Sequence, residues 1–383
     1  MSFFWNVTRR VSSTALAYCS AFLHYKKTRP NVVGFVLITT QGTKERHVVM
    51  QIKRKVLRNL LQQAAVGLAD KEMLEQSTCF VFRASRIITF SGDVLVRIPS
   101  TLARNLGELV VRAPDLLKLV DKLPDETIDV RRSDSHLILK GSRRQAGVGF
   151  WTSVLLPYQD VKPPSTESSE WAEAPKDLAG RMAQAALICG RDETHYLTTC
   201  VHMNRRVVEA CDNVRFYRGN GQTYLPKDVI ASGRSIAKLA GMPITHTCVR
   251  KSWLHFKLAN RGTVSVRLAR VAKYIQGIDD VGKLDNPQTV KLPTNLTDIL
   301  GRAQIMSEGE DVTFTLTPSK LQLLARKEGG WFRESKRVRY NGPRLSFAVN
   351  PKFLLEIYQR AKSVEVTPTK MRVKTSNEVF VVA

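Results

Sequence analysis

One pattern recurs three times along this chain at the spacing of whole domains. Residues 113–130, 225–249 and 350–368 each contain a proline, then an apolar stripe of about three helical turns, then a strand-like run. Because the units of solenoid proteins repeat every ~20–50 residues, the wider spacing indicates repeated domains. Each proline suits the first turn of its helix, and these residues are Pro114, Pro226 and Pro351. Three copies of one small module therefore account for most of the chain.

Each module also contains an earlier helix and two strand-like runs. The apolar periodicity predicts these helices over 56–68, 178–189 and 296–306. Alternating or β-branched residues predict strands over 79–90, 196–212 and 312–325. The predicted fold class is therefore α+β, with three repeated domains that each pack two helices on antiparallel sheet.

Polar, turn-forming joints separate the modules. Residues 161–175 are rich in Pro, Ser and Glu, and residues 277–287 combine Gly, Asp, Asn and Pro. We expect domains over 50–162, 172–282 and 288–383.

Residues 1–49 form a basic extension outside the repeats. Their composition is typical of a transit peptide, of a weak signal sequence, or of sequence upstream of a true start at Met50. We favour an appendage. Its apolar runs, over 15–25 and 32–39, are too short to span a bilayer, so no membrane partner is predicted.

The net charge predicts a polyanionic partner. The chain has 59 Lys and Arg against 34 Asp and Glu, a formal charge of +25. Nucleic acid is favoured over membrane because no lipid-binding amphipathic helix stands out. A basic surface without a specific partner is the alternative.

The residue patterns of enzymes and metal sites are absent from the sequence. There is no GxxxxGK[ST] loop, no GxGxxG after a strand, no HExxH and no nucleophile elbow. The six cysteines form no CxxC pair. Cys200, His202 and Cys211 are close in sequence, but their alternating apolar neighbours favour strand positions over zinc ligands. We expect a non-catalytic protein with free thiols in a reducing, cytoplasmic compartment, without metal or cofactor.

Five stretches, in order, resemble the bacterial beta sliding clamps, the beta subunits of DNA polymerase III. The resemblance covers about residues 50–383. It is carried by MQIKRKVLRNLLQQ (50–63), VRAPDLLKLVDKLPDE (111–126), ACDNVRFY (210–217, where the family usually reads ATDGHRLA), PKDVIASGRSIAKLAG (226–241) and LSFAVNPKFLLEIYQRA (345–361).

The resemblance implies a ring-shaped processivity factor. Two copies would close head to tail into a ring of six domains, with twelve helices lining the hole. Such a ring encircles duplex DNA without sequence specificity and tethers the replicative DNA polymerase after a clamp loader has placed it. Its expected location is the nucleoid in the cytoplasm, or the host cytoplasm if the chain is phage-encoded.

Basic residues on the helices are the candidate DNA contacts. Three pairs lie four residues apart along a helical face, and further basic residues sit on the same helices. The resemblance adds Lys71 and Arg191, in loops after the first helices. A solvated helix face is the alternative reading. The helical candidates are Arg54, Arg58, Lys118, Lys122, Arg181, Arg234, Lys238, Arg302, Lys352, Arg360 and Lys362.

The resemblance also places a partner-peptide groove and a dimer interface. For both, ordinary core packing is the alternative. The dimer contact would join Ile305 and Met306 to Phe150 of the first module. The groove would be lined by Leu197, Cys211, Val214, Arg215, Phe216, Val381 and Ala383.

Several features depart from the family pattern. Asn213 and Val214 replace a glycine and a histidine, Phe216 replaces a smaller aliphatic residue, and the chain ends in VFVVA instead of a Met-Pro-Met-Arg-Leu-like tail. The strong positive charge also differs, since such clamps are commonly acidic overall. A divergent clamp carried by a bacteriophage or other mobile element is consistent with these departures.

Two other functions are compatible with the same sequence. One is a basic nucleic-acid-binding repeat protein that forms no ring. The other is a clamp-fold protein that recruits or inhibits partners without supporting processive synthesis.

Overall fold

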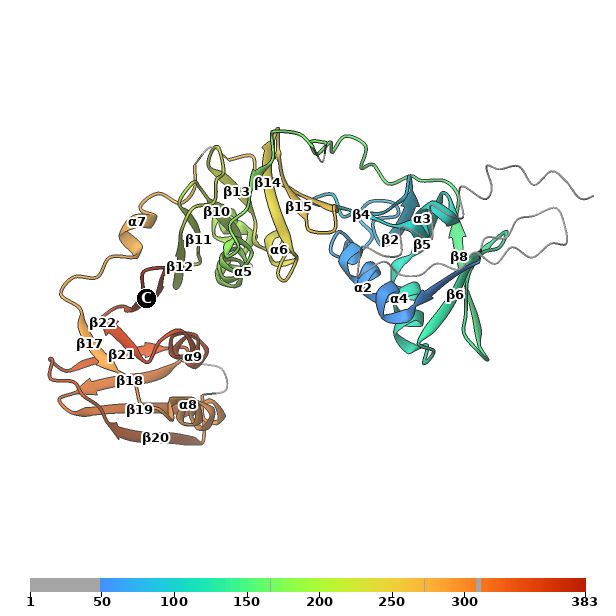
Figure 1. Cartoon of the computed structure of the whole chain (residues 1–383). Helices are drawn as coiled ribbons and strands as arrows, with labels where there is room; N and C mark the ends of the chain where they lie inside the picture. Colours follow the sequence, from blue (N-terminus) through green and yellow to red (C-terminus); the bar gives the residue numbers. More distant parts are fainter. Residues whose placement is uncertain (1–48, 166, 272, 308–310) are drawn as a thin grey trace, which may run out of the picture.

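The computed structural model describes residues 49–165, 167–271, 273–307 and 311–383. The expectation for residues 1–49 lies outside this range, apart from Val49. The described chain forms an arc of three modules, with pairs of helices on its concave side and sheets on its convex side (Figure 1).

All three modules share one element order: a strand, a helix, four strands, a second helix and three more strands. Module 1 has an extra short helix, α3 (Thr101–Leu106). Its other elements are β1 (Met50–Lys53), α2 (Arg54–Ala65), β2 (Cys79–Arg83), β3 (Arg86–Phe90), β4 (Val94–Pro99), β5 (Leu109–Arg112), α4 (Ala113–Lys122), β6 (Thr127–Arg132), β7 (His136–Lys140) and β8 (Gln145–Trp151).

Module 2 repeats this order and adds a 3-10 helix, η1 (Glu193–Thr199), before its second strand. Its other elements are β9 (Ala172–Glu173), α5 (Leu178–Ile188), β10 (Cys200–Met203), β11 (Val207–Cys211), β12 (Arg215–Asn220), β13 (Val229–Ser232), α6 (Gly233–Ala237), β14 (Ile244–Arg250), β15 (Trp253–Leu258) and β16 (Thr263–Arg267).

Module 3 follows a linker that contains the short helix α7 (Ile278–Val281). Its elements are β17 (Gln288–Lys291), α8 (Leu296–Ile305), β18 (Val312–Thr317), β19 (Lys320–Lys327), β20 (Gly330–Arg337), β21 (Leu345–Val349), α9 (Pro351–Arg360), β22 (Ser363–Val366), β23 (Met371–Lys374) and β24 (Glu378–Val382).

The predicted first helices are confirmed, because their apolar stripes face the sheets. In α2, Leu57, Leu61 and Ala64 are buried at a spacing of three to four residues. The second helices begin as expected in modules 1 and 3, where Pro114 and Pro351 occupy the first turn.

Two local predictions in module 2 are wrong. Pro226 lies in the loop before β13, and α6 begins at Gly233. The apolar residues after Pro226 form a buried strand instead, because Val229 and Ile230 pair with β10. Residues 196–199 belong to η1, where the Asp192 side chain accepts a hydrogen bond from Thr194 N and caps the turn.

The sheets continue across both boundaries between modules. Val94–Arg97 of β4 pair antiparallel with Thr263–Val266 of β16, which joins modules 1 and 2 into a 12-stranded sheet. Arg215–Gly219 of β12 pair with Glu378–Val382 of β24, which joins modules 2 and 3 into an 8-stranded sheet. We call these pairings seam 1 and seam 2.

The linkers cover the convex face of both seams. Leu156, Tyr158 and Val161, between β8 and β9, pack on Leu95 of β4 and on Trp253 of β15. In the second linker, Ile278 packs on Phe216 of β12 and Val381 of β24. The convex strands of modules 1 and 2 are consequently buried on both faces.

Module 3 differs, because its convex face has no such cover among the described residues. Its strands alternate strictly, with Val312, Phe314 and Leu316 buried and the intervening threonines partly exposed. Trp331 on β20 is 65% exposed. This sheet is therefore covered on one face only.

A buried histidine under the first linker gives a pH-dependent prediction. His255 on β15 is 1% exposed and its Nδ1 lies 2.7 Å from Ser265 Oγ. Burial, with smaller effects from Arg97 and Arg250, lowers its pKa from 6.5 to about 4. The unfolded chain therefore binds a proton at a higher pH than the folded chain, and stability falls as the pH drops from 6.5 to 4.

We expect this histidine to account for about 3 kcal/mol of lost stability across that window. The free energies of unfolding of the wild type and of His255→Asn can be measured with denaturant between pH 7 and pH 4. The difference between them should change by that amount across this range. His136→Asn, at an exposed position, is the control and should follow the wild type. Parallel profiles for wild type and His255→Asn would contradict the prediction.

Candidate nucleic-acid interface

Six helices form the concave wall of the arc: α2 and α4, α5 and α6, α8 and α9 (Figure 1). Their buried residues face the sheets, so the opposite faces point into the concavity. On α4, for example, Ala113, Leu116 and Val120 are buried while Lys118 and Lys122 are exposed. This arrangement presents basic groups from all three modules to one space.

A cleft of about 710 Å³ at the junction of modules 1 and 2 joins four of the predicted DNA contacts. Lys71 comes from the loop after α2, Arg191 from the loop after α5, and Arg234 and Lys238 from α6 and its C-terminal end. Lys238 Nζ donates to Leu68 O at 2.8 Å, a contact that bridges the two modules. Arg234 lies 3.6 Å from exposed Glu193, which leaves its guanidinium largely solvated.

Two other predicted contacts are buried in structural roles. The Arg181 side chain is only 7% exposed; it donates to Gly221 O at 2.8 Å and Gln222 O at 2.7 Å, and pairs with Asp177. Arg360 is 12% exposed and lies across seam 2, where it binds Gln184 and Glu378. Neither guanidinium is accessible to a phosphate in this structure.

The remaining basic residues of the wall have varied surroundings. Arg58 pairs with Asp121 at 2.6 Å, and Arg54 donates to Asp121 O at 3.2 Å. Arg302 pairs with Glu334. Lys352 is exposed on α9, and Lys362 Nζ lies 3.1 Å from the centroid of the Tyr358 ring.

Lys55 is a further basic residue that was not predicted as a DNA contact, and it is exposed on α2 between Arg54 and Arg58. Its place on the helical face opposite the buried residues Leu57 and Leu61 is the sequence pattern that could have identified it. Acidic residues also reach the wall, since Asp115 and Asp121 are exposed on α4. The concave surface is therefore mixed in charge, and much of the basic excess lies on strands and turns.

Most residues of the predicted peptide groove lie around seam 2, and three of them are buried. Cys211, Phe216 and Val381 form one packed cluster with Ile278 of α7, and Phe216 is 1% exposed. Burial raises the pKa of the Cys211 thiol to about 11, so the thiol stays protonated at neutral pH. Linker residues Tyr274, Ile275 and Val281 complete the cluster and were missed, because nothing local in their sequence indicates which strands they cover.

The other groove residues surround this cluster. Val214 is 39% exposed, and its carbonyl oxygen accepts from Ala383 N at 2.8 Å. Arg215 pairs with Asp212 and Glu356. Leu197 lies on η1 and is not part of the cluster.

The predicted dimer residues occupy the two ends of the arc. Phe150 lies on β8, and Ile305 and Met306 end α8, where Ile305 is 65% exposed. Trp151 on β8 is 49% exposed. Both ends thus expose apolar side chains. They lie beside β20, an edge strand, and beside β8, which pairs with β7 and, through Phe150 and Trp151 alone, with β5.

Cys200 and His202 lie in β10 and Cys211 in β11, which confirms their predicted strand positions. Among the described residues, no group of His, Cys, Asp or Glu has an arrangement that could hold a metal ion. None of the helices in the described ranges is long and apolar enough to span a bilayer.

Solved structures with the same architecture exist. The beta subunit of DNA polymerase III from Thermotoga maritima superposes with a TM-score of 0.71 at 16% identity, over 87% of this chain and 98% of that one. The corresponding subunit from Pseudomonas aeruginosa gives 0.68 at 18% identity, over 88% and 99%. The beta subunit from Streptococcus pyogenes gives 0.68 at 15% identity, over 88% and 99%.

The chain has the fold of a beta sliding clamp. The predicted resemblance is confirmed at the level of structure, over all three modules. No protein-family model matches the sequence, and neither does any curated protein sequence. At these identities the sliding-clamp fold is shared while most side chains differ.

The buried arginine of α5 gives a prediction that separates structural from surface roles. We expect Arg181→Ala to lower the free energy of unfolding by about 2–3 kcal/mol, because two backbone carbonyls and Asp177 lose their charged donor. Lys118→Ala, on an exposed helical face, should change it by less than ~0.5 kcal/mol. Urea unfolding of both variants tests this, and equal effects would contradict the assigned roles.

Proposed function

We propose that this chain is a DNA sliding clamp: two copies close head to tail into a ring around duplex DNA and tether a DNA polymerase. The observation that carries the proposal is the repetition of the seams. Each seam joins the fourth strand of one module to the last strand of the next. In the described chain, β20 and β8 are the fourth and last strands that pair with no other module, and residues 145–148 of β8 pair on one side only, with β7. A second copy can complete both.

The internal repeat fixes the expected register of this third seam. The hairpins that lead into the fourth strands can be aligned on their turns, and this alignment makes Val94 of β4, Arg215 of β12 and Gly330 of β20 equivalent. The same alignment of the hairpins that lead into the last strands makes Val266 of β16, Val382 of β24 and Val148 of β8 equivalent. Gly330 should therefore pair with Val148 of the partner subunit, and Arg333 with Gln145 of the partner subunit. Trp331 would then cover the convex side of the joint.

Ring closure accounts for the modest basic character of the concave wall. A protein that is held on DNA by topology needs only weak, replaceable phosphate contacts, which position the duplex without reading its bases. The cleft that joins Lys71 to Arg234 and the exposed lysines of α4 and α9 provide contacts of this kind. The proposed activity is non-catalytic.

The partners of the proposed clamp are duplex DNA, a second copy, a replicative polymerase and a clamp loader. The burial of Phe216 and Cys211, two residues expected to contact a partner peptide, supports a second candidate: a clamp-fold protein that recruits or inhibits partners without supporting synthesis. A primer-extension assay with the polymerase of the same cell or phage separates the two.

Paired cysteines test the ring. In Arg333→Cys with Gln145→Cys, directly opposed side chains on one sheet face should form a disulfide between subunits. Arg333→Cys with Ala146→Cys is the matched control, since adjacent strand residues point to opposite faces. Non-reducing electrophoresis should give covalently linked dimers for the first variant alone. Equal cross-linking in both variants would contradict the register.

The same variant tests DNA encirclement. Oxidation in the presence of nicked circular plasmid should give a complex that survives high salt and is released when the plasmid is linearised. Release from the intact circle in high salt would overturn the proposed ring.

The phosphate contacts give a separate, quantitative prediction. Alanine at Lys71, Lys118, Lys122 and Lys352 should reduce the slope of log affinity against log salt for a short duplex by about 2–4, since each lost contact contributes ~0.9. Alanine at four convex-side positions, Lys227, Lys251, Lys273 and Lys320, is the control and should change it by less than about 1. Fluorescence anisotropy at several salt concentrations measures both, and equal losses would contradict the proposed wall.

A further inference from the structure

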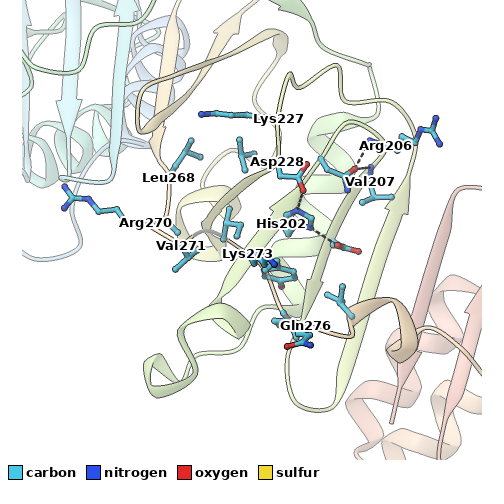
Figure 2. Close-up of a pocket in the computed structure, with 18 of the residues that line it drawn as sticks. His202, Arg206, Val207, Lys227, Asp228, Leu268, Arg270, Val271, Lys273 and Gln276 are labelled. Carbon is cyan, nitrogen blue, oxygen red and sulfur yellow. Dashed lines mark hydrogen bonds and ion pairs between the residues drawn. The ribbon is translucent and has the colours of Figure 1, made fainter.

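The convex face of module 2 contains a cavity of about 1270 Å³ between the sheet and the second linker. Figure 2 shows His202 at its centre, Lys227 and Asp228 above it, and linker residues 268–271 and 273–276 along one side. The cavity lies on the opposite face of the sheet from α5 and α6, so it is separate from the concave wall. It exceeds the ~300–1,000 Å³ of typical small-molecule pockets.

The floor of the cavity is ionic and carries more acidic than basic groups. Buried Glu209 accepts from His202 Nδ1 at 2.7 Å and from Arg218 Nε, and Arg218 also binds Asp279 at 2.6 Å. His202 Nε2 lies 3.4 Å from Asp228. These three carboxylates share Arg218 and His202, so the floor alone does not favour an anion. The positive charges of the rim outnumber them.

The rim, in contrast, is basic and uncompensated. Five exposed cations line the cavity, and the described part of the chain gives none of them a carboxylate partner. In Figure 2, Arg206 and Arg270 extend from opposite ends of the rim, with Lys227 along the top. Such a ring of like charges favours an anionic ligand that spans the opening. The five are Arg206, Lys227, Lys251, Arg270 and Lys273.

The walls between these cations are apolar. Val207, Leu268 and Ile275 are partly exposed, and Val271 is 38% exposed. A ligand that fills the cavity must therefore combine negative charge with apolar side chains.

Nucleic acid fits this combination poorly. Single strands bind through aromatic faces on which bases stack. Tyr274 is the aromatic residue of the lining, and its ring is stacked on His202 with 5.1 Å between the centroids. One face of the ring is thus already occupied.

We propose that this cavity is a docking site for an extended, acidic segment of a partner protein that carries apolar side chains. The carboxylates of this segment would pair with the cations of the rim, and its apolar side chains would pack against the apolar walls. The site is adjacent to the packed cluster around Phe216, with which it shares Tyr274 and Ile278. The proposal rests on the cavity of a single chain and does not require the ring.

A defined peptide tests the site. We expect a fluorescein-labelled octapeptide of alternating Asp and Leu to bind the wild-type chain, measured by fluorescence anisotropy. Lys227→Glu, Arg270→Glu and Lys273→Glu combined should weaken binding by about tenfold or more. These side chains are exposed, so the fold is expected to tolerate the changes.

A variant with the same change in net charge provides the control. Lys71→Glu, Lys118→Glu and Lys352→Glu combined should leave peptide binding within about twofold. An octapeptide of alternating Asp and Ser should bind more weakly, because it lacks apolar groups.

Three results would overturn the proposal. They are no binding of the Asp–Leu peptide, an equal loss of peptide binding in both triple variants, and displacement of the labelled peptide by an eight-nucleotide oligo-dT as effectively as by unlabelled Asp–Leu peptide. The outcome is independent of the proposed clamp function. The rim variant that also carries Arg333→Cys and Gln145→Cys should still cross-link around nicked circular DNA. If the chain forms no ring, this cross-linking should be absent while the Asp–Leu peptide still binds.

Discussion

Main-chain pairing between edge strands is the interaction on which the architecture depends. Strand β4 pairs with β16 and β12 with β24, so the sheets run continuously across both boundaries between modules. Backbone hydrogen bonds set the angle and register of one module against the next. Every module therefore presents its helix pair to the same side, and the concave wall is a consequence of the seams.

The pairing also explains how much of the structure could be predicted from sequence. The helices α2, α5 and α8 were predictable, because their apolar stripes are local signals that the sheets satisfy. The helix α6 was placed too early, since Pro226 resembles a helix start while Val229 and Ile230 are recruited into β13 by β10. Non-local strand pairing overrode a local helical signal there.

The individual candidate residues were harder to predict for the same reason. Arg181 looks like any basic residue on a helix, and its buried role depends on carbonyl groups about forty positions away, at Gly221 and Gln222. Phe216 and Cys211 lie near seam 2, and their burial depends on a linker whose packing has no sequence signature. Charge was the least specific guide, because a total of +25 does not reveal which face carries it.

The bare convex face of module 3 has a mechanical consequence. Seams 1 and 2 are each held twice, once by strand pairing and once by a covalently attached linker that packs over the joint. A junction between β20 and β8 of the partner subunit would be held by the strands and their side chains alone, with no tether to keep separated edges near one another. In the proposed ring those two junctions would separate first, and their opening rate would limit how fast duplex DNA enters or leaves.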